Sequence, residues 1–376
     1  MTSWDDERLA RAVLSGVCEP ADPRLEPLLG EYGAVAALSA LRNSADDSAW
    51  ARRARAADEQ SLVRVAAELG LRYVIPTDDE WPTQLSDLGR CAPVGGMGGV
   101  PLGLWVLGSP PLAQWLAGAV AVVGARAATR YGEAVAGDLA ARLATLQPTG
   151  YTVVSGGAYG IDAAAHWAVL GAAGRTVGVY AGGLDSPYPK GNSRLFEHLA
   201  TDHLVISELA PGVRATRAGF LARNRLIAAL SLGTVVVEAA ARSGARNTAS
   251  WAGELGRVVM AVPGSVHSSM SVGCHRLIRD GQANLVCDSD DVAALLAPIG
   301  SGPDLPTLGV QRPLDGLEAE LLEVREAMPG SGGIQASELA EKCGRPVPGT
   351  VAALVELELL GLVRRDDLGD WRLRRP

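Results

Sequence analysis

Cysteine is scarce in this sequence, and its spacing excludes two kinds of site. The five cysteines are scattered, and no two of them form a C-x-x-C pair. The five histidines likewise lack the spacing of a zinc-binding pair with nearby cysteines or carboxylates. Disulfide frameworks and structural zinc sites both depend on such spacings. We therefore expect no disulfide scaffold, no metal site and no bound cofactor.

Positive charge and long apolar runs are also limited. The net charge is −8, which excludes a protein that is basic over its whole surface, as many nucleic-acid binders are. Any contact with DNA or RNA must come from a local patch. The N-terminus begins with acids and has no apolar signal segment, and Gly, Pro or charge interrupts the apolar stretches. We expect no signal peptide and no membrane span, and therefore a cytoplasmic protein.

Two nucleotide-binding motifs are absent as well. The first strand expected in the central region is followed by Gly-Ala-Arg-Ala-Ala-Thr-Arg-Tyr-Gly at 124–132. This run is not G-x-G-x-x-G, and the Gly-Lys-Ser/Thr of a P-loop is missing from the sequence. The dinucleotide fingerprint and P-loop hydrolysis of a nucleoside triphosphate therefore have no support.

Short apolar runs alternate with helical patterns between residues 120 and 286. The runs at 120–123, 151–154, 176–180, 204–207, 234–237, 258–262 and 285–286 predict strands. Helical spacing at 131–146, 161–170, 193–199, 220–230 and 248–255 fills the intervals. Strands that alternate with helices indicate an α/β fold with a doubly wound, mostly parallel sheet. Such sheets bind ligands outside the carboxyl ends of their strands.

The regions on either side of this sheet have different patterns. Residues 1–70 predict a helical domain of the SAM or helix-hairpin-helix kind, and residues 71–119 an extension of the core with an edge strand at 104–108. A linker rich in Pro and Gly at 299–313 leads to residues 314–376, where three helices and a hairpin predict a winged helix. Its third helix has two glutamates and no Lys or Arg. Contact with protein, or simple structural docking, is therefore as good an interpretation of this unit as contact with DNA.

A glycine-rich turn joins the second strand of the sheet to its helix. The turn reads Ser155-Gly156-Gly157-Ala158-Tyr159-Gly160. Glycines let the backbone come close to a phosphate and direct N–H groups toward it. Asp162 follows in the first helical turn, where a carboxylate can orient the loop. The alternative is a tight turn that binds no ligand.

Arginines cluster around one of the two phenylalanines. Arg217, Arg223 and Arg225 lie near Phe220 with no acid among them. Between 205 and 260 there are seven Arg and three Glu, an excess of four positive charges in an acidic chain. Guanidinium groups pair with phosphates, and an aromatic ring beside them can stack on a base of a single strand. The alternatives are surface arginines and a phenylalanine in the core.

Two further basic residues follow strands. Arg126 comes after the first strand, and Lys190, one of two lysines in the chain, after the third. Both are therefore expected at the edge of the sheet where ligands bind. For Arg126, an ordinary surface arginine is an equally open interpretation.

The sequence places no nucleophile and base at a fixed spacing. Ser155 has no suitably spaced histidine. Glu238 follows Gly233-Thr234, a pattern typical of nucleotide-processing enzymes that keep a catalytic glutamate. It could equally be the buried partner of Arg223 or Arg225. Catalysis is therefore an alternative that depends on Glu238.

Together these motifs resemble the bacterial DNA-processing protein A (DprA, or Smf) family. The likeness covers residues 71–298. It rests on Val-Val-Gly-Ala-Arg, Ser-Gly-Gly-Ala-Tyr-Gly-Ile-Asp-Ala-Ala-Ala-His, Gly-Gly-Leu-Asp-x-x-Tyr-Pro, Phe-x-x-Arg-Asn-Arg-Leu-Ile-Ala, Leu-Gly-Thr-Val-Val-Val-Glu-Ala and Val-Pro-Gly-Ser. These motifs are long and occur in order. The helical and winged units are similar to the flanking domains of that family.

The resemblance implies a Rossmann-like core that binds and protects single-stranded DNA, forms homodimers and loads the RecA recombinase in transformation and recombination, without catalysis. Arg126, Lys190 and Arg217 would contact phosphates, and Phe220 would stack on a base. The remaining pocket residues carried over by position are Ser155, Gly156, Gly157, Gly160, Arg223, Asn224 and Arg225. Tyr159 stands where many relatives carry Arg or Lys, which would weaken one phosphate contact.

Two other functions remain open. One is a nucleotide-processing enzyme, such as a nucleoside-monophosphate phosphoribohydrolase, on the same kind of fold. Such enzymes usually show Pro-Gly-Gly-x-Gly-Thr before the glutamate, whereas this chain has Leu-Ser-Leu-Gly-Thr at 230–234 and lacks the glycines of that phosphate cradle. The other is a DNA-associated scaffold whose winged unit binds only protein.

Overall fold

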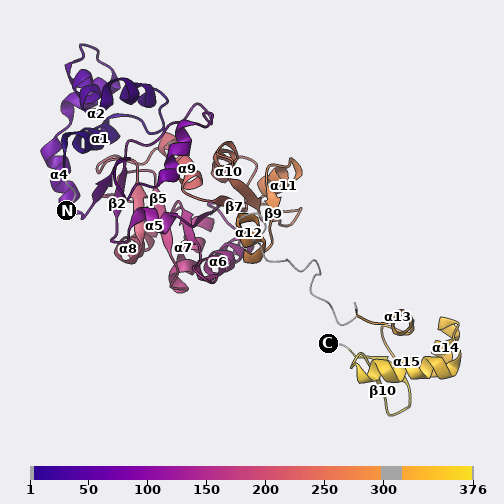
Figure 1. The fold of residues 1–376 in the computed structure, drawn as a ribbon. Helices are drawn as coiled ribbons and strands as arrows, with labels where there is room; N and C mark the ends of the chain where they lie inside the picture. The colour runs from indigo at the N-terminus through magenta and orange to yellow at the C-terminus, as the bar shows by residue number, and fades with distance from the viewer. Residues whose placement is uncertain (1–3, 298–315, 375–376) are drawn as a thin grey trace. The chain divides into compact units, whose positions relative to one another are not determined.

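A nine-stranded sheet forms the centre of the first of two compact units, Met1–Pro303 and Asp304–Pro376. The structure is a computed structural model that describes residues 4–297 and 316–374 (Figure 1). The linker predicted at 299–313 lies outside the described residues. Among the helices of the described ranges, none combines the length and the apolar character that crossing a membrane requires.

The sheet is mostly parallel, as predicted. Its strands are β1 (Arg72–Val74), β2 (Leu104–Leu107), β3 (Ala119–Gly124), β4 (Thr152–Ser155), β5 (Thr176–Tyr180), β6 (Leu204–Ser207), β7 (Gly233–Val237), β8 (Val258–Ala261) and β9 (Asn284–Leu285). They lie in the order β1-β2-β6-β5-β4-β3-β7-β8-β9. The prediction of an edge strand at 104–108 was wrong. β2 lies between β6 and β1, because the short run at 72–74 pairs with it antiparallel and forms the edge instead.

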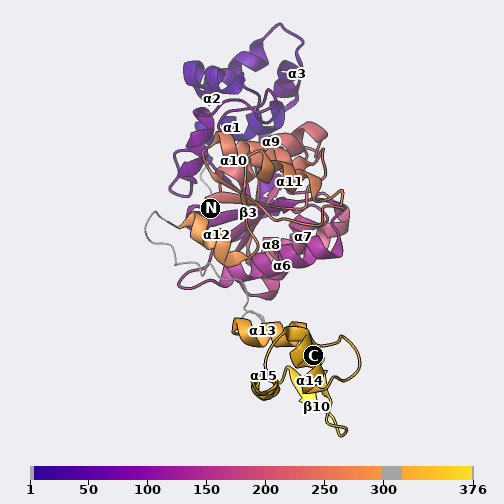
Figure 2. The same cartoon turned by 90° about the vertical axis from the view of Figure 1, so that its right-hand side faces the viewer.

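Helices cover both faces of the sheet. One face carries α6 (Arg130–Thr145), α7 (Ile161–Gly171), α8 (Ser193–Asp202) and α12 (Ser289–Leu296), and the other carries α9 (Arg217–Ala229), α10 (Gly244–Glu254) and α11 (Val272–Arg279). Figure 2 shows α6, α7 and α8 on one side and α9, α10 and α11 on the other. Successive strand residues point to opposite faces, so Val120 and Val122 of β3 join one core and Ala121 and Val123 the other.

The strand order reverses at β3. The chain proceeds from β3 outward through β4, β5 and β6, and then returns to β7 on the other side of β3. The crossover connections therefore leave the carboxyl ends of β3 and β7 in opposite directions. In doubly wound sheets this reversal leaves a crevice at the strand ends, and ligands bind there.

Four helices precede the sheet in the first unit. They are α1 (Asp6–Val17), α2 (Leu25–Asn43), α3 (Ala49–Ala56) and α4 (Glu59–Glu68). α1 is attached to β2 of the sheet, because the Trp105 indole N–H donates to the Ser15 hydroxyl at 3.0 Å. The Arg8 guanidinium also donates to both carboxylate oxygens of Asp78, at 2.6 and 2.7 Å.

Residues 316–374, the described part of the second unit, form three helices and a two-stranded sheet. Its elements are α13 (Ala319–Glu326), α14 (Ala336–Cys343), α15 (Val347–Leu359), β10 (Val363–Arg365) and β11 (Trp371–Leu373). The order of these elements is the one predicted for residues 314–376. They enclose their own core around Val324, Leu354, Leu357 and Trp371.

Candidate nucleic-acid interface

A cleft of about 760 Å³ opens at the carboxyl ends of β3 and β7. Its walls are the loop after β3, the turn before α7, the first turns of α9, and the loop that leads from β7 into α10. Four arginines line it (Arg126, Arg217, Arg223 and Arg242), against one carboxylate, that of Asp162. The sheet edge expected from the strand pattern is therefore a positively charged cleft in a chain of net charge −8.

Phe220 is held in this cleft between two neighbours. The Arg126 guanidinium lies over its ring, 4.6 Å from the ring centroid. The ring of Tyr188 lies on it at 5.6 Å between centroids, with the planes tilted by 58°. Phe220 is half-buried and Tyr188 is exposed, so an aromatic surface remains accessible at the mouth of the cleft.

α9 begins earlier than the sequence pattern predicted, at Arg217 instead of Phe220. The Thr216 hydroxyl caps the helix by accepting from the Gly219 N–H at 3.0 Å. Arg217 and Phe220 are three residues apart and therefore lie on the same side of the first turn. The exposed Arg217 guanidinium and the Phe220 ring both line the cleft.

Arg223 lies deeper, next to the glycine turn. It is 5% exposed and donates to the Val179 carbonyl at 3.0 Å. Burial lowers the pKa of Arg223, and the nearby Asp162 acts in the opposite direction. A Cβ atom on Gly156 would collide with the Arg223 guanidinium. Gly156 is therefore required where this buried cation passes beneath the backbone.

The glycine turn is closed by Asp162, as the sequence suggested. Its carboxylate accepts from the N–H groups of Gly156 at 3.2 Å and Ala158 at 3.3 Å. Burial raises the pKa of Asp162, while Arg223 and these two N–H groups lower it. Gly157 and Gly160 have φ values of 64° and 72°, in the left-handed region that favours glycine. The turn conformation therefore depends on these glycines and on the carboxylate.

Ser155 and Tyr159, at either end of the turn, point in different directions. The Ser155 hydroxyl is buried and donates to the Val122 carbonyl at 2.6 Å, so this side chain does not line the cleft. Tyr159 is exposed, and its ring packs over Gly191. Lys190, also exposed, precedes that glycine. Tyr159 and Lys190 therefore lie together beyond the residues that line the cleft.

The placement of Arg225 in the pocket wall was wrong. Its guanidinium is fully buried and donates to both carboxylate oxygens of Glu208, at 2.9 and 2.6 Å, and to the Gly99 carbonyl at 3.2 Å. Arg223 and Arg225 are two residues apart on a helix, so they point to different sides of it. Arg225 and Glu208 therefore form a buried, structural ion pair within the first unit.

Asn224 does line the cleft. Its side-chain N–H donates to the side-chain Oδ1 of Asn247 at 3.2 Å and to the backbone carbonyl of Gly244 at 3.4 Å. This connects α9 to the first turns of α10. Because the Asn224 side chain is nearly buried, its position is determined by α10.

Several residues that line the cleft were not identified from the sequence. They are Tyr188, Arg242, Ser243, Gly244 and Asn247. A signal was present in the Arg-Ser-Gly run, because it follows the strand β7 just as Arg126 follows β3. α10 also starts at Gly244, with the Ser243 hydroxyl accepting from the Ala245 N–H, rather than at residue 248. The N-terminus of α10, which favours anions, therefore faces the cleft.

Glu238 and His166 are both engaged elsewhere. The Glu238 carboxylate accepts from the Thr129 N–H at 2.8 Å and the Thr129 hydroxyl at 2.6 Å. It is therefore the partner of the N-cap of α6, and of the two interpretations left open by the sequence, the pairing with Arg223 or Arg225 is not the one that the structure shows. His166 Nδ1 lies 2.7 Å from the Thr176 hydroxyl oxygen. Thr176 is on β5, whereas Ser155 is on β4. The described residues hold no cluster of three potential metal ligands.

The chain matches known proteins over most of its length. The family model of DNA recombination-mediator protein A matches residues 72–297. A DNA processing protein DprA of Mycobacterium tuberculosis is 45% identical, over 99% of this chain and 95% of that protein. Protein Smf of Escherichia coli is 37% identical, over 68% of each chain.

Two solved structures extend this likeness to the fold. DNA processing protein A of Streptococcus pneumoniae covers 78% of this chain and 98% of its own, with 32% identity and a TM-score of 0.62. DNA processing protein A of Helicobacter pylori, whose structure is described for its single-stranded DNA binding mode, covers 59% and 94%, with 26% identity and a TM-score of 0.50. This chain belongs to the family of DNA recombination-mediator protein A, whose members are named DprA or Smf.

Proposed function

We propose that this protein binds single-stranded DNA in the cleft at β3 and β7 and acts as a recombination mediator that protects the strand and loads RecA onto it. The observation that carries the proposal is the juxtaposition of four arginines with the accessible Phe220–Tyr188 surface. Guanidinium groups bind phosphates, and exposed rings bind unstacked bases.

The geometry favours a single strand over a duplex. Arg126 and Arg217 are both exposed and line the cleft together with Phe220, and they would bind successive phosphates. A base could reach the Phe220 ring only after leaving its own stack, which a duplex opposes by pairing and stacking. Arg242 and the N-terminus of α10 add positive potential on the opposite wall. Lys190 and Tyr159 would continue the contact outside the cleft.

We further propose that the protein functions without catalysis, as a homodimer, in recombination and DNA transformation. The helices α1–α4 and the unit with α15 would be its flanking helical and winged-helix domains. The enzyme alternative is disfavoured because both carboxylate oxygens of Glu238 are bound to Thr129. A general base must be within reach of the proton that it removes, and this carboxylate is 5% exposed.

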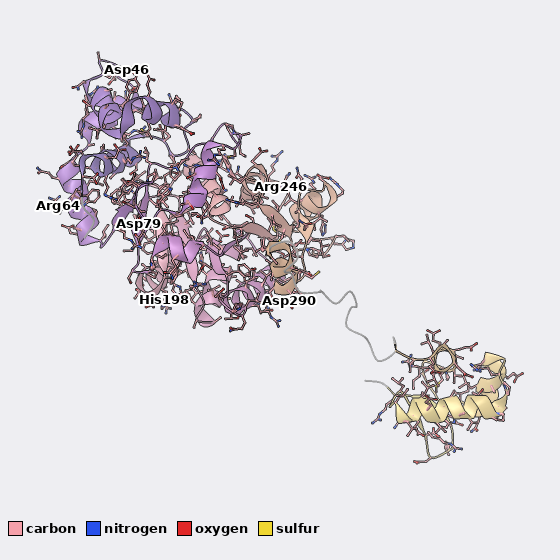
Figure 3. All side chains as sticks on the ribbon, in the orientation of Figure 1. Asp46, Arg64, Asp79, His198, Arg246 and Asp290 are labelled. Atoms are coloured by element: carbon pink, nitrogen blue, oxygen red, sulfur yellow. The ribbon has the colours of Figure 1, made fainter. Side chains whose placement is uncertain are left out.

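The test is a fluorescence-anisotropy titration of labelled oligo-dT and of a matched duplex at two salt concentrations. Wild type should prefer the single strand. The Arg217→Ala, Phe220→Ala variant should lose that preference. The slope of log K against log salt concentration should also become shallower by about 0.7, because one phosphate contact is lost. The matched control is Arg64→Ala, an exposed arginine of α4 that Figure 3 labels far from Arg246 of α10. Equal, weak binding to both DNAs that the variant leaves unchanged would contradict the proposal.

The loading of RecA requires its own assay. Single-stranded DNA is first covered with a single-strand-binding protein, which blocks RecA, and the RecA ATPase rate on this DNA is followed. Wild type should shorten the lag before the ATPase reaches its full rate, and the Arg217→Ala, Phe220→Ala variant should not. If wild type binds oligo-dT but leaves the lag unchanged, the chain binds DNA without loading RecA.

A further inference from the structure

α15 has an apolar stripe on the side that faces solvent. Val347, Val351, Val355 and Leu359 recur every four residues and are 44%, 37%, 45% and 84% exposed. Residues spaced by four lie on one face of a helix. The opposite face, with Leu354 among its residues, supplies the buried core of the second unit. The stripe is therefore additional to what α15 needs for folding.

This stripe does not have the chemistry of a helix that reads DNA. A recognition helix enters the major groove with side chains that donate to bases and phosphates. α15 has no Lys or Arg, and its exposed polar side chains include Glu356 and Glu358. Carboxylates beside an apolar stripe would repel the phosphates of a duplex. The chemistry of this face fits a protein surface.

No charged side chain of α15 compensates the dipole at either end of the helix, although backbone N–H groups cap the carbonyls at its C-terminus. The N-cap is Pro346, without a side-chain cap hydrogen bond, and the first turn has no acid. The last turn has no base, and Glu356 and Glu358 lie near it. A helix carries partial positive charge at its N-terminus and partial negative charge at its C-terminus. The glutamates near the C-terminus of one α15 would therefore stabilise the N-terminus of another α15.

We propose that α15 pairs antiparallel with α15 of a second copy of this chain. The stripe is symmetric about residue 353, so antiparallel pairing sets Val351 against Val355 and Val347 against Leu359 of the other copy. The same arrangement sets Glu356 and Glu358 beside the uncapped N-terminus of the other α15. In a parallel pair, each glutamate would instead lie opposite the same glutamate of the second copy. The apolar pattern and the charge pattern both select the antiparallel arrangement.

Helix pairing of this size is weak by itself. One stripe on each of two helices buries less than the roughly 1,200–2,000 Å² of a stable interface. Pairing should therefore depend on protein concentration and increase wherever chains are held close together. The stripe and the cleft belong to different units, and pairing of the stripe does not require that the cleft bind DNA.

Disulfide cross-linking of the full-length chain tests the arrangement. Chains with Val351→Cys are mixed with chains with Val355→Cys under mild oxidation. The mixture should form cross-linked dimers several-fold faster than either variant alone, because residues 351 and 355 oppose each other. Leu368→Cys, at an apolar residue of the second unit that is 82% exposed and therefore more accessible than Val351 or Val355, is the control and should stay near the wild-type background of the native cysteines. A mixture no faster than this control would overturn the proposal.

Sedimentation velocity over a range of concentrations tests the association itself. Wild type should gain a larger species as concentration rises, and Val351→Asp with Val355→Asp should lose it. Both substitutions are at exposed positions, and an unchanged circular dichroism spectrum would verify that the variant folds. If the variant sediments like wild type but binds duplex DNA more weakly, the stripe contacts DNA and the proposal is wrong. Loss of oligo-dT binding to the cleft would contradict the proposed function and leave this result untouched.

Discussion

The Arg126 guanidinium carbon lies 4.6 Å from the centroid of the Phe220 ring. Arg126 follows β3 and Phe220 lies in the first helical turns of α9, so this contact connects two segments that are distant in sequence. In the function proposed above, this contact would hold the ring for a base and the guanidinium for a phosphate at the same time. Cation–π pairs at exposed sites contribute about 0.5–1 kcal/mol.

We expect the effects of Arg126→Ala and Phe220→Ala on DNA binding to be non-additive. Each change alone should weaken oligo-dT binding by about 1–3 kcal/mol, through a lost phosphate contact or a lost stack. Because the two side chains touch, the loss of binding free energy in the double variant should be smaller than the sum of the two single losses. We expect the difference to be about 0.5 kcal/mol or larger. Dissociation constants of the four proteins at one salt concentration measure this coupling. Strict additivity would show that the contact has no role in binding.

A second prediction concerns Gly156. A Cβ atom in Gly156→Ala would collide with the Arg223 guanidinium, so Arg223 should lose its bond to the Val179 carbonyl. We expect oligo-dT binding to fall at least about tenfold and the free energy of unfolding to fall by about 1–3 kcal/mol. Gly171→Ala is the matched control, because no atom lies within 4 Å of a Cβ at that position. Equal behaviour of the two variants in both assays would refute the steric argument.

The sheet and the position of the cleft could be predicted because they depend on local patterns. Apolar runs and helical spacing recur in order, and strand ends of a doubly wound sheet meet at one edge. Which face a side chain occupies is harder to predict. Arg223 and Arg225 lie in one motif, yet one lines the cleft and the other pairs with Glu208. The angle between positions on a helix could have separated them. Glu208, the partner of Arg225, could not be identified, because the two residues are 17 positions apart on different elements and no local pattern connects them.

The contributions of loops were not predictable in the same way. Tyr188 belongs to a loop without periodicity, and its contact with Phe220 depends on how that loop returns to α9. The edge position of β1 depended on three residues, too few for a period-two pattern to be distinguished from chance. Such features follow from tertiary contacts rather than from the local sequence.

A third prediction separates Arg225 from the arginines that line the cleft. Arg225→Ala leaves the buried carboxylate of Glu208 without its partner, and breaking a buried pair in this way costs about 3–5 kcal/mol. Arg64→Ala removes an exposed arginine near Glu68, and should cost less than about 1 kcal/mol. Urea denaturation followed by tryptophan fluorescence, to which the fully buried Trp105 and Trp251 of the first unit contribute, measures both. A wild-type midpoint for Arg225→Ala would contradict the structural role.

The fourth prediction concerns the stability of the first unit in mild acid. His166 is fully buried, and burial lowers its pKa from 6.5 to about 3. The Thr176 hydroxyl donates to the Val153 carbonyl at 2.8 Å, so it accepts from Nδ1 of a neutral His166 ring. Between pH 6.5 and pH 3 the unfolded chain therefore takes up a proton that the folded chain does not. Stability from this residue is complete above pH 6.5 and is lost progressively as the pH falls.

We expect this proton uptake to cost about 2 kcal/mol of unfolding free energy at pH 5 relative to pH 7.5. His166→Gln removes the titrating group, so the variant should be less stable at pH 7.5 but should lose about 2 kcal/mol less than wild type on acidification. Urea denaturation at both pH values gives the comparison. His198→Gln is the control, because His198 is exposed on α8 (Figure 3) and its removal should preserve the wild-type difference. If His166→Gln and wild type lose equal stability between the two pH values, His166 is not the residue that couples folding to pH.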